Sequence, residues 1–356
     1  MEIDCRDAVP LYHHPDARLT EGVTYIAETD TLYWVDIFKA EVHRVRDLQG
    51  DPAHTFAEKH TVFTASRGTY SKDANAVPYP DSEMGESIGV VFPDHKDSNV
   101  VYFAAKFGIG RVDLSRDHWE YLVLYEWCPE LTLDRVRKLR SNDGNVSPCG
   151  KYIFVGIMRD FPYPVDDSGC ILRVSLETRT LEIVWDHIRI ANSLHWNSQE
   201  DRMYITDSLA FCLWECPYDT ATATLDRTAA TKQIDIRANT PERFVSPEPD
   251  GSQLDPQTGL LYVCVWSTGS VQVYDTRNGK FLARILLPEN TMRASCCCLV
   301  GDKLYVTTAN EDIDNPTAAT ADPHGGCLYL LDLPALPNSE TASAALQSSK
   351  GPLKAT

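Results

Sequence analysis

Six stretches of the chain share one pattern of hydrophobic and polar positions. Each has an apolar strand containing an aromatic residue, a polar turn, and a second strand in which apolar residues alternate. The first reads TLYWVDIFKAEVHRV, from Thr31 to Val45. A period of two is that of a half-buried β-hairpin. The other five hairpins begin near Val100, Tyr152, Met203, Leu261 and Leu304.

The spacing of these hairpins predicts the fold class. They recur about every 40–70 residues, which fits the four-stranded blade of a propeller. One hairpin cannot bury its own apolar face, whereas neighbouring blades cover each other. We therefore expect an all-β, six-bladed β-propeller that forms a single domain over residues 1–336. A strand candidate at Ala8–Leu11 is expected to join the last blade and close the ring, because two sheet edges otherwise stay open.

Two segments depart from the repeat. Residues 50–86 are rich in Pro, Ser, Asp and Tyr and exceed what a blade needs. They are interpreted as a loop insertion with room for a short strand at His60–Ala65, either a solvated surface insertion or a lid near the channel mouth. Residues 337–356 have few apolar anchors, so this tail is expected to be disordered.

Composition excludes several classes of function. The net charge of −18 disfavours a nucleic-acid partner. There is no apolar run of about 18 residues and no N-terminal signal pattern, so we expect no membrane partner and no secretion. The eleven cysteines form no paired metal motif, and Cys296–Cys298 suit a buried strand. Reduced cysteines indicate a cytoplasmic protein. The expected partner is a small molecule, and the expected state is a monomer or weak dimer.

Oxygen-bearing side chains recur at one position of the repeat. Equivalent positions on the innermost strands of a propeller form a ring around the channel, so these side chains are expected to converge. Two carboxylates close together in a shielded channel repel each other unless a cation is bound. The pattern favours one hard divalent cation, and the alternative is a set of ordinary turn residues. The residues are Glu21, Asn192 and Asp250, each twelve positions before a repeat aromatic, and Asp143 beside Asn142.

Short motifs occur in a fixed order from about Leu19 to Leu333. They are Leu19–Gly22 with Leu32–Asp36, Arg140–Gly144, Ile190–Asn192 with Tyr204–Ser208, Pro249–Gly251 with Val265–Trp266, and Cys296–Cys297 with Leu304–Ala309. Together they resemble the SMP-30/gluconolactonase/luciferin-regenerating enzyme family. The resemblance implies a six-bladed propeller with one divalent metal on its axis, whether Ca²⁺, Zn²⁺, Mg²⁺ or Mn²⁺. It implies Glu21, Asn192 and Asp250 as metal ligands, and Arg140 with Asn142 as substrate-binding residues.

The resemblance implies a metal-dependent, lactonase-type carboxylic ester hydrolase that opens a lactone or related cyclic ester at the mouth of the channel. The metal would polarise the carbonyl. The attacking water would be deprotonated by Asp250 or be bound to the metal as hydroxide. Two alternatives stay open: a metal-dependent isomerase or cyclase of small-metabolite biosynthesis, and a non-catalytic binding propeller.

The run Phe161–Pro164 predicts the specificity. It lies between the two strands of the third hairpin, where sugar-lactonase members of the family are more polar. Phe161 and Tyr163 are therefore expected to contact the substrate and to favour a lactone with an apolar or aromatic portion over a simple aldonolactone. The insertion at residues 50–86, with Tyr70 and Tyr79, is expected to approach the same mouth.

Overall fold

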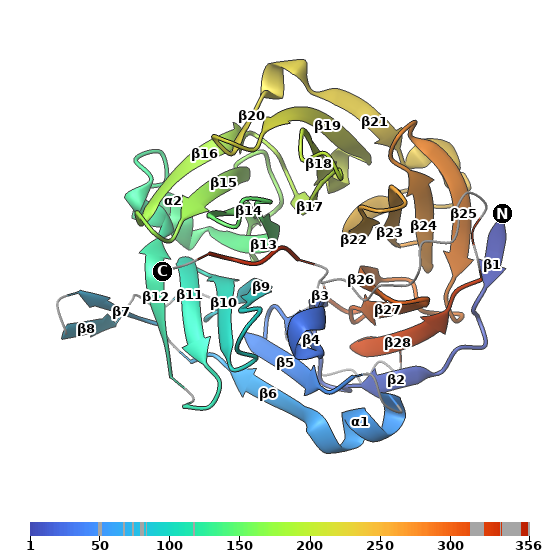
Figure 1. The fold of residues 1–356 in the computed structure, drawn as a ribbon, viewed down its shortest axis with the longest axis horizontal. Helices are drawn as coiled ribbons and strands as arrows, with labels where there is room; N and C mark the ends of the chain where they lie inside the picture. Colours follow the sequence, from blue (N-terminus) through green and yellow to red (C-terminus); the bar gives the residue numbers. More distant parts are fainter. Residues whose placement is uncertain are drawn as a thin grey trace.

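The protein was analysed as a computed structural model that describes residues 1–48, 52–66, 68–72, 75–78, 82, 84–116, 118–313, 324–334, 336 and 350–354. Six β-sheets stand around a central channel (Figure 1), which confirms the predicted six-bladed propeller. The two α-helices of the described residues are short: α1 (Pro52–Lys59) and α2 (Leu133–Arg137). No helix in this part of the chain is long and apolar enough to cross a membrane.

Each blade is an antiparallel meander whose first strand lines the channel and whose later strands follow outwards. Blade 1 contains β3 (Thr20–Ile26), β4 (Thr31–Asp36), β5 (Glu41–Arg46) and β6 (His60–Thr64). Blade 2 contains β9 (Ile88–Pro93), β10 (Val100–Ala105), β11 (Gly108–Asp113) and β12 (His118–Leu124). Blade 3 contains β13 (Leu139–Val146), β14 (Tyr152–Arg159), β15 (Cys170–Ser175) and β16 (Thr180–Asp186).

The remaining three blades follow the same order. Blade 4 contains β17 (Ala191–Trp196), β18 (Arg202–Asp207), β19 (Cys212–Asp219) and β21 (Thr231–Asp235), with β20 (Thr224–Leu225) also paired to β19. Blade 5 contains β22 (Glu248–Asp255), β23 (Leu260–Trp266), β24 (Ser270–Asp275) and β25 (Lys280–Leu286). Blade 6 contains β26 (Ala294–Val300), β27 (Lys303–Thr308) and β28 (Cys327–Asp332). All six predicted hairpins are therefore the second and third strands of a blade.

The N-terminal segment contributes a strand to each of two blades. Strand β2 (Pro10–His13) pairs with β28 and supplies the outer strand of blade 6, which confirms the predicted closure. Strand β1 (Glu2–Asp4) pairs in parallel with β25 and adds an outer strand to blade 5. The sequence did not predict this second pairing, because three residues carry no periodic signal.

The insertion at residues 50–86 is more ordered than a loop. Helix α1 leads into β6, which occupies the position predicted for a short strand and is the fourth strand of blade 1. Strands β7 (Thr69–Lys72) and β8 (Asn75–Pro78) extend blade 2 beyond β12 (Figure 1). Tyr70 on β7 is opposite Tyr121 at this outer edge. This pairing places the Tyr70 backbone on the outer edge of blade 2, and Tyr79 lies outside the described residues, so the approach of the insertion to the mouth stays a prediction.

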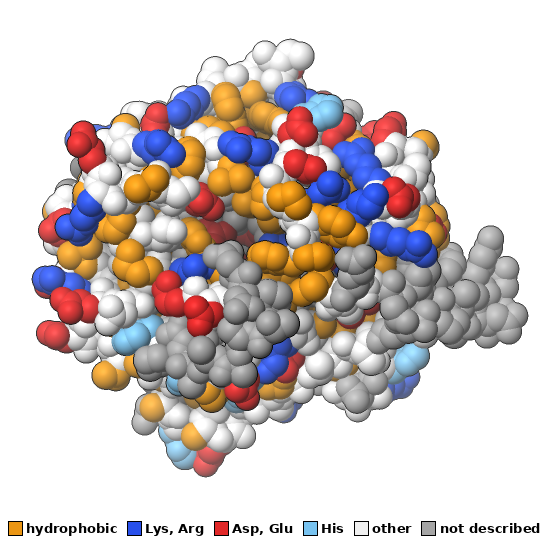
Figure 2. Space-filling model, turned by 180° about the vertical axis from the view of Figure 1, so that it is seen from behind, with side chains coloured by type: hydrophobic (Ala, Val, Ile, Leu, Met, Phe, Trp, Pro, Cys, Tyr) orange, Lys and Arg blue, Asp and Glu red, His pale blue; other side chains and the backbone are white. Residues whose placement is uncertain are grey.

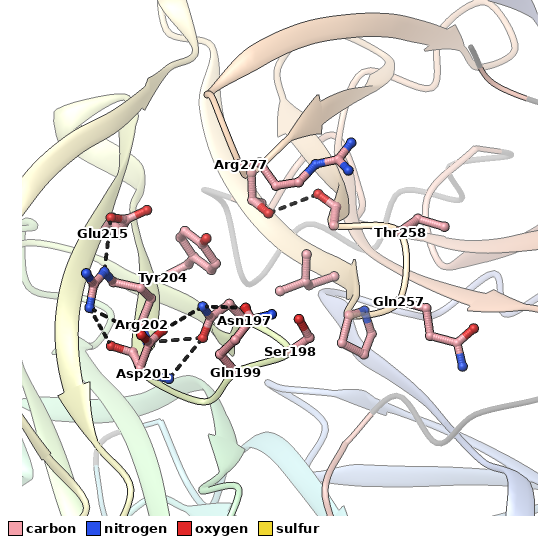
Figure 3. Close-up of a pocket in the computed structure, with 14 residues that line it drawn as sticks. Asn197, Ser198, Gln199, Asp201, Arg202, Tyr204, Glu215, Gln257, Thr258 and Arg277 are labelled. Carbon is pink, nitrogen blue, oxygen red and sulfur yellow. Dashed lines mark hydrogen bonds and ion pairs between the residues drawn. The ribbon is translucent and has the colours of Figure 1, made fainter. Parts of the chain in front are cut away.

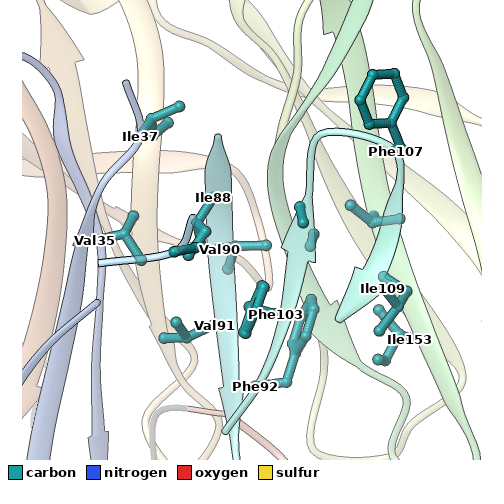
Figure 4. Close-up of a cluster of buried hydrophobic side chains, with 14 of the residues drawn as sticks. Val35, Ile37, Ile88, Val90, Val91, Phe92, Phe103, Phe107, Ile109 and Ile153 are labelled. Carbon is teal, nitrogen blue, oxygen red and sulfur yellow. The ribbon is translucent and has the colours of Figure 1, made fainter. Parts of the chain in front are cut away.

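The core lies between the blades. Alternate residues of facing strands interdigitate in the cluster that joins blades 1, 2 and 3 (Figure 4), where Val35, Val90, Phe103, Ile109 and Ile153 are all fully buried. Burying such a side chain stabilises the fold by roughly 1.5–3 kcal/mol. These contacts fix the innermost strands and, with them, the side chains that face the channel.

The cysteines belong to this structural framework. All eleven are free thiols, and Cys296, Cys297 and Cys298 are buried on β26, as predicted for a strand. The Cys297 thiol donates to the carbonyl oxygen of Tyr262 on the neighbouring blade.

Residues 350–354 lie against β13 and cross the channel on the face seen in Figure 1. The Lys350 ammonium donates to the Gly144 carbonyl oxygen (2.6 Å) and is 3.8 Å from the Asp143 carboxylate. The Lys354 amide donates to the Gly150 carbonyl, and Leu353 packs on the core. The tail was expected to be disordered. These five residues instead have specific partners, and residues 337–349 lie outside the described part of the chain.

Candidate active site

Irregular strand pairing directs polar side chains towards the channel. In β3, β13, β17 and β22 the register with the next strand shifts, so that residues between Glu21 and Thr24, Ser141 and Gly144, Ala191 and Leu194, and Pro249 and Ser252 are left out of the ladder. A β-bulge of this kind re-aims the side chains beside it. The recurrent Gly or Ser after each polar residue belongs to these bulges.

Two glycines show why small residues are needed there. Gly22 has a φ of 60°, in the left-handed region that favours glycine. At Gly251 an added Cβ would lie 2.5 Å from the Cβ of Cys296 on blade 6. The bulges therefore rely on glycine both for backbone conformation and for close packing between blades.

One pocket brings the predicted site residues together. Its volume is about 380 Å³, and it opens at the face shown in Figure 2, where a hollow has acidic side chains at its base. All seven residues predicted to bind metal or substrate line it. They are Glu21, Arg140, Asn142, Phe161, Tyr163, Asn192 and Asp250. The structure thus places them around one space, and their individual roles stay predictions.

The carboxyl groups of Glu21 and Asp250 are adjacent on the channel axis. Burial raises the pKa of both groups, that of Asp250 to about 8 and that of Glu21 well above its usual range. The Asp250 and Asp143 carboxylates raise the pKa of Glu21 further. Around Asp250, a hydrogen bond from Asn192 opposes the rise, while Glu248 and Asp143 add to it. Without a cation, the pair therefore holds a proton at neutral pH.

The donor set fits a hard divalent cation once one amide turns. The Asn192 amide nitrogen donates to the Asp250 carboxylate and to Ser208 Oγ (3.3 Å), while its oxygen accepts from the Ser193 amide (3.0 Å). Turning this amide would present its oxygen beside the carboxyls of Glu21 and Asp250. Carboxylate and amide oxygens are the ligands that Ca²⁺ and Mg²⁺ prefer. Across the described ranges, no three His, Cys, Asp or Glu side chains are arranged to hold a metal, and a site built on these two carboxyls would need the Asn192 amide oxygen as well.

Asp143 faces away from this pocket, along the channel. Its carboxylate accepts from the Gly144 amide (2.7 Å) and from Ser193 Oγ (2.6 Å), which in turn accepts from the Ser252 amide (2.8 Å). It lines a separate, narrow space together with Lys350. These contacts are those of a residue that packs the channel.

Arg140 is buried beside the carboxyl groups. Its Nη1 donates to the Ser141 carbonyl (3.0 Å) and to Asn142 Oδ1 (2.8 Å). The Asn142 amide nitrogen donates to the Ala191 carbonyl (3.1 Å), so Asn142 is fixed and in turn orients Arg140. The Arg140 guanidinium also lies over the ring of Phe38, 5.5 Å from its centre.

The loop after β14 forms one wall of the pocket. Phe161 packs edge-on against Phe38, with ring centres 5.3 Å apart. Tyr163 lies beneath the Arg159 guanidinium, which is paired with Asp166 at 3.1 Å. The predicted aromatic run is therefore an ordered wall whose position comes from blade 1 as well as blade 3.

The pocket also contains residues that the sequence did not single out as functional. Glu248 precedes Asp250 by two positions on β22, so period two alone would have placed both on one face. Arg293 is paired with Glu311 (3.2 Å) and covers Trp266 on the opposite side of the pocket. Neither Arg293 nor Ser208 lies at the repeat position that identified the ligands.

A second pocket, of about 350 Å³, lies between the β17–β18 turn and the β22–β23 turn. Figure 3 shows Arg202 in contact with Asp201 and Glu215, at 3.8 and 3.6 Å. Arg277, at the other side, is paired with Asp275 at 2.8 Å. The arginines of this second pocket already have counter-ions nearby, and none of the predicted site residues lines the pocket. The pocket with paired carboxyls is therefore the candidate active site.

The fold and this site define a six-bladed propeller with a polar, carboxylate-lined pocket at one end of its channel. The chain belongs to the family described as SMP-30/Gluconolactonase/LRE-like region, whose model matches residues 19–310. This confirms the resemblance drawn from the sequence motifs.

Three similar proteins illustrate the range of the family. The chain is 44% identical to the uncharacterised protein YBR053C of Saccharomyces cerevisiae, over 98% of this chain and 96% of that protein. It is 26% identical to L-arabinolactonase of Azospirillum brasilense, over 88% and 87%. Among solved structures, regucalcin of Agrobacterium tumefaciens, described as a calcium-binding protein, has a TM-score of 0.70 at 22% identity, with 96% of this chain and 99% of that chain covered.

Proposed function

We propose that this protein is a metal-dependent hydrolase that opens a lactone or related cyclic ester in the pocket at the channel mouth. The observation that carries the proposal is the convergence of Glu21, Asn192 and Asp250 with Arg140 in one pocket. Similarity to a protein named L-arabinolactonase supports the reaction class.

Asp250 has the properties of a general base. Burial raises its pKa to about 8 in the metal-free protein, and a bound cation would favour the ionised form, which accepts the proton of the attacking water. Arg140, oriented by Asn142, donates to the substrate or to the carboxylate formed when the ring opens. Burial of both groups keeps bulk water away from the reacting atoms and strengthens these interactions.

A bound divalent cation would be held by Glu21, Asp250 and the turned amide of Asn192. It would supply Lewis-acid polarisation of the ester carbonyl and neutralise the paired carboxylates. Calcium is the first ion to test, because a structural neighbour is described as calcium-binding.

The aromatic wall sets the substrate preference in this proposal. Phe161 and Tyr163 present apolar surface that is already ordered by Phe38 and Arg159, so little entropy is lost when a substrate packs on it. A lactone with an apolar or aromatic portion should therefore bind better than a simple aldonolactone.

The test is a lactone panel combined with metal analysis. Chelator-dialysed protein is assayed with pentonolactones, gluconolactone and aryl-substituted lactones, each with Ca²⁺, Zn²⁺, Mg²⁺ or Mn²⁺. We expect metal-restored ring opening and one bound ion per chain in the wild type. Asp250→Ala should lose the ion, while Asp255→Ala, at the other end of β22, should keep it. Equal metal content in wild type and Asp250→Ala would refute the metal site, and metal-independent or absent hydrolysis would refute the activity.

A further inference from the structure

A buried ion pair lies behind Arg140. Lys106, in the turn between β10 and β11, is 1% exposed, and Asp160, directly after β14, is 2% exposed. The Lys106 ammonium donates directly to Oδ2 of Asp160. Neither residue lines the pocket, so neither is expected to touch a substrate.

The second oxygen of Asp160 forms only a long ion pair with Arg140. Oδ1 accepts a hydrogen bond from the Phe161 amide (2.9 Å) and is 3.9 Å from Arg140 Nε. That distance is too long for a hydrogen bond. Arg140 Nε is buried and has no hydrogen-bond partner. Among the described contacts, Arg140 donates hydrogen bonds through Nη1, and its ion pair with Asp160 is not reinforced by a hydrogen bond.

Two cations therefore share one carboxylate. Glu86 also faces Lys106; it accepts from the Lys106 amide (3.0 Å) and the Tyr121 hydroxyl (2.7 Å), and burial raises its pKa to about 7. The other acidic groups that act on Arg140 are Glu21 and Asp250, the candidate metal ligands. A buried ion pair is weak evidence for stability, because an apolar pair of similar size is often as stable. The Lys106–Asp160 pair matters instead for its electrostatic effect on Arg140.

We propose that Lys106 is a positioning residue for the binding of an anion: by engaging Asp160, it keeps that carboxylate from forming a hydrogen-bonded pair with Arg140, whose guanidinium stays available to the pocket. The anion that Arg140 then receives is the carboxylate released by ring opening or the oxyanion that precedes it. This inference rests on the proposed function and names a residue that acts on the site without contacting the substrate.

The inference predicts a recovery that a packing role would not produce. In Lys106→Met, Asp160 has only Arg140 as a counter-ion, so the Arg140 charge is drawn to Asp160 and attracts an anion in the pocket less strongly. In Lys106→Met/Asp160→Asn, both charges of the pair are absent and Arg140 is again available to an anion, while the introduced asparagine side chain can still accept from the Phe161 amide. The double variant should therefore bind an anion better than the single variant does. Additive damage to packing would make it bind the same or worse.

The experiment measures gluconate binding by calorimetry, with gluconolactone kinetics alongside. We expect Lys106→Met to weaken gluconate binding and to lower kcat, each about tenfold, with KM nearly unchanged, because the anion that Arg140 receives forms only as the ring opens. The double variant should return to within about threefold of wild type. Lys303→Met, which removes a lysine paired with Asp332 on the surface of blade 6, should leave both values unchanged. Thermal melting and circular dichroism establish that each variant is folded.

The outcomes separate this inference from the proposed function. If lactone hydrolysis is absent but gluconate binding falls and recovers as described, the proposed function fails and the role of Lys106 stands. If hydrolysis is present but Lys106→Met binds gluconate like the wild type, the role of Lys106 is refuted. Failure of the double variant to recover, or absence of gluconate binding to the wild type, also refutes it.

Discussion

Replacing Asp250 with Asn should make the metal-free protein more stable at alkaline pH. The Asp250 carboxyl is placed beside Glu21 in a buried channel, and its pKa is raised from 3.8 to about 8. A carboxyl whose pKa is higher in the folded state favours folding below its unfolded pKa. That contribution is lost as pH rises towards the folded pKa. Asn keeps the shape and can still accept the hydrogen bond from Asn192, but it does not ionise.

The size of the effect follows from the pKa. Each pKa unit corresponds to 1.36 kcal/mol, so the rise from 3.8 to about 8 is worth roughly 6 kcal/mol over the whole range. Roughly 4 kcal/mol of this falls between pH 5 and pH 8.5. With an unfolding entropy of about 2.1 cal/mol/K per residue, that amounts to roughly 5 °C in Tm for a chain of this length.

The assay is thermal unfolding of chelator-treated wild type, Asp250→Asn and the control Asp255→Asn from pH 5 to pH 8.5. The Tm of the wild type should fall relative to that of Asp250→Asn as pH rises, while Asp255→Asn should follow the wild type. Saturating Ca²⁺ should raise the Tm of the wild type far more than that of Asp250→Asn, because ligand binding stabilises the folded state. A Tm difference between wild type and Asp250→Asn that does not change with pH would refute the reasoning.

Two further predictions concern activity. Asp250→Asn should lower turnover roughly 10²–10⁴-fold, the range for loss of a general base, and near-normal turnover would assign the base to another residue. Phe161→Ser/Tyr163→Ser should weaken binding of an aryl-substituted lactone in steady-state assays and leave the metal content intact. Efficient gluconolactone hydrolysis that this double substitution does not change would show that the wall is only a surface turn.

The fold could be predicted from sequence because each blade carries its own signal. The aromatic strand and its partner recur six times, and each strand has a period of two that does not depend on distant contacts. Glu21, Asn192 and Asp250 could be found for the same reason: they keep a constant distance from a repeat aromatic, and in the structure each lies at the bulge of an innermost strand. Because the pattern repeats, a position identified in one blade also identifies the equivalent positions in the other blades.

Features outside the repeat gave no such signal. Lys106 lies in a turn of blade 2, whose innermost strand is apolar, and its partner Asp160 is 54 positions away. Nothing local indicates that this lysine turns inward, because the reason is the charge of a residue on another blade. Helix α1 and strands β7 and β8 were likewise missed. Their turn-rich composition indicates a loop, and the packing of α1 on β5 and the pairing of β7 with β12 override it.

The pairing of β1 and β2 with strands from the other end of the chain affects the order in which the ring is assembled. The amino group of Met1 donates to the carbonyl oxygen of Leu282, 281 positions along the chain. During synthesis, residues 1–13 are therefore made long before the strands that they complete, and they pair only after β25 and β28 have emerged. Pairing between such distant segments is slow, because the entropy of closing the chain is lost before any contact compensates for it. Until then the edges of β25 and β28 that β1 and β2 cover in the folded protein are exposed. Another chain can pair with these edges before the N-terminal segment does.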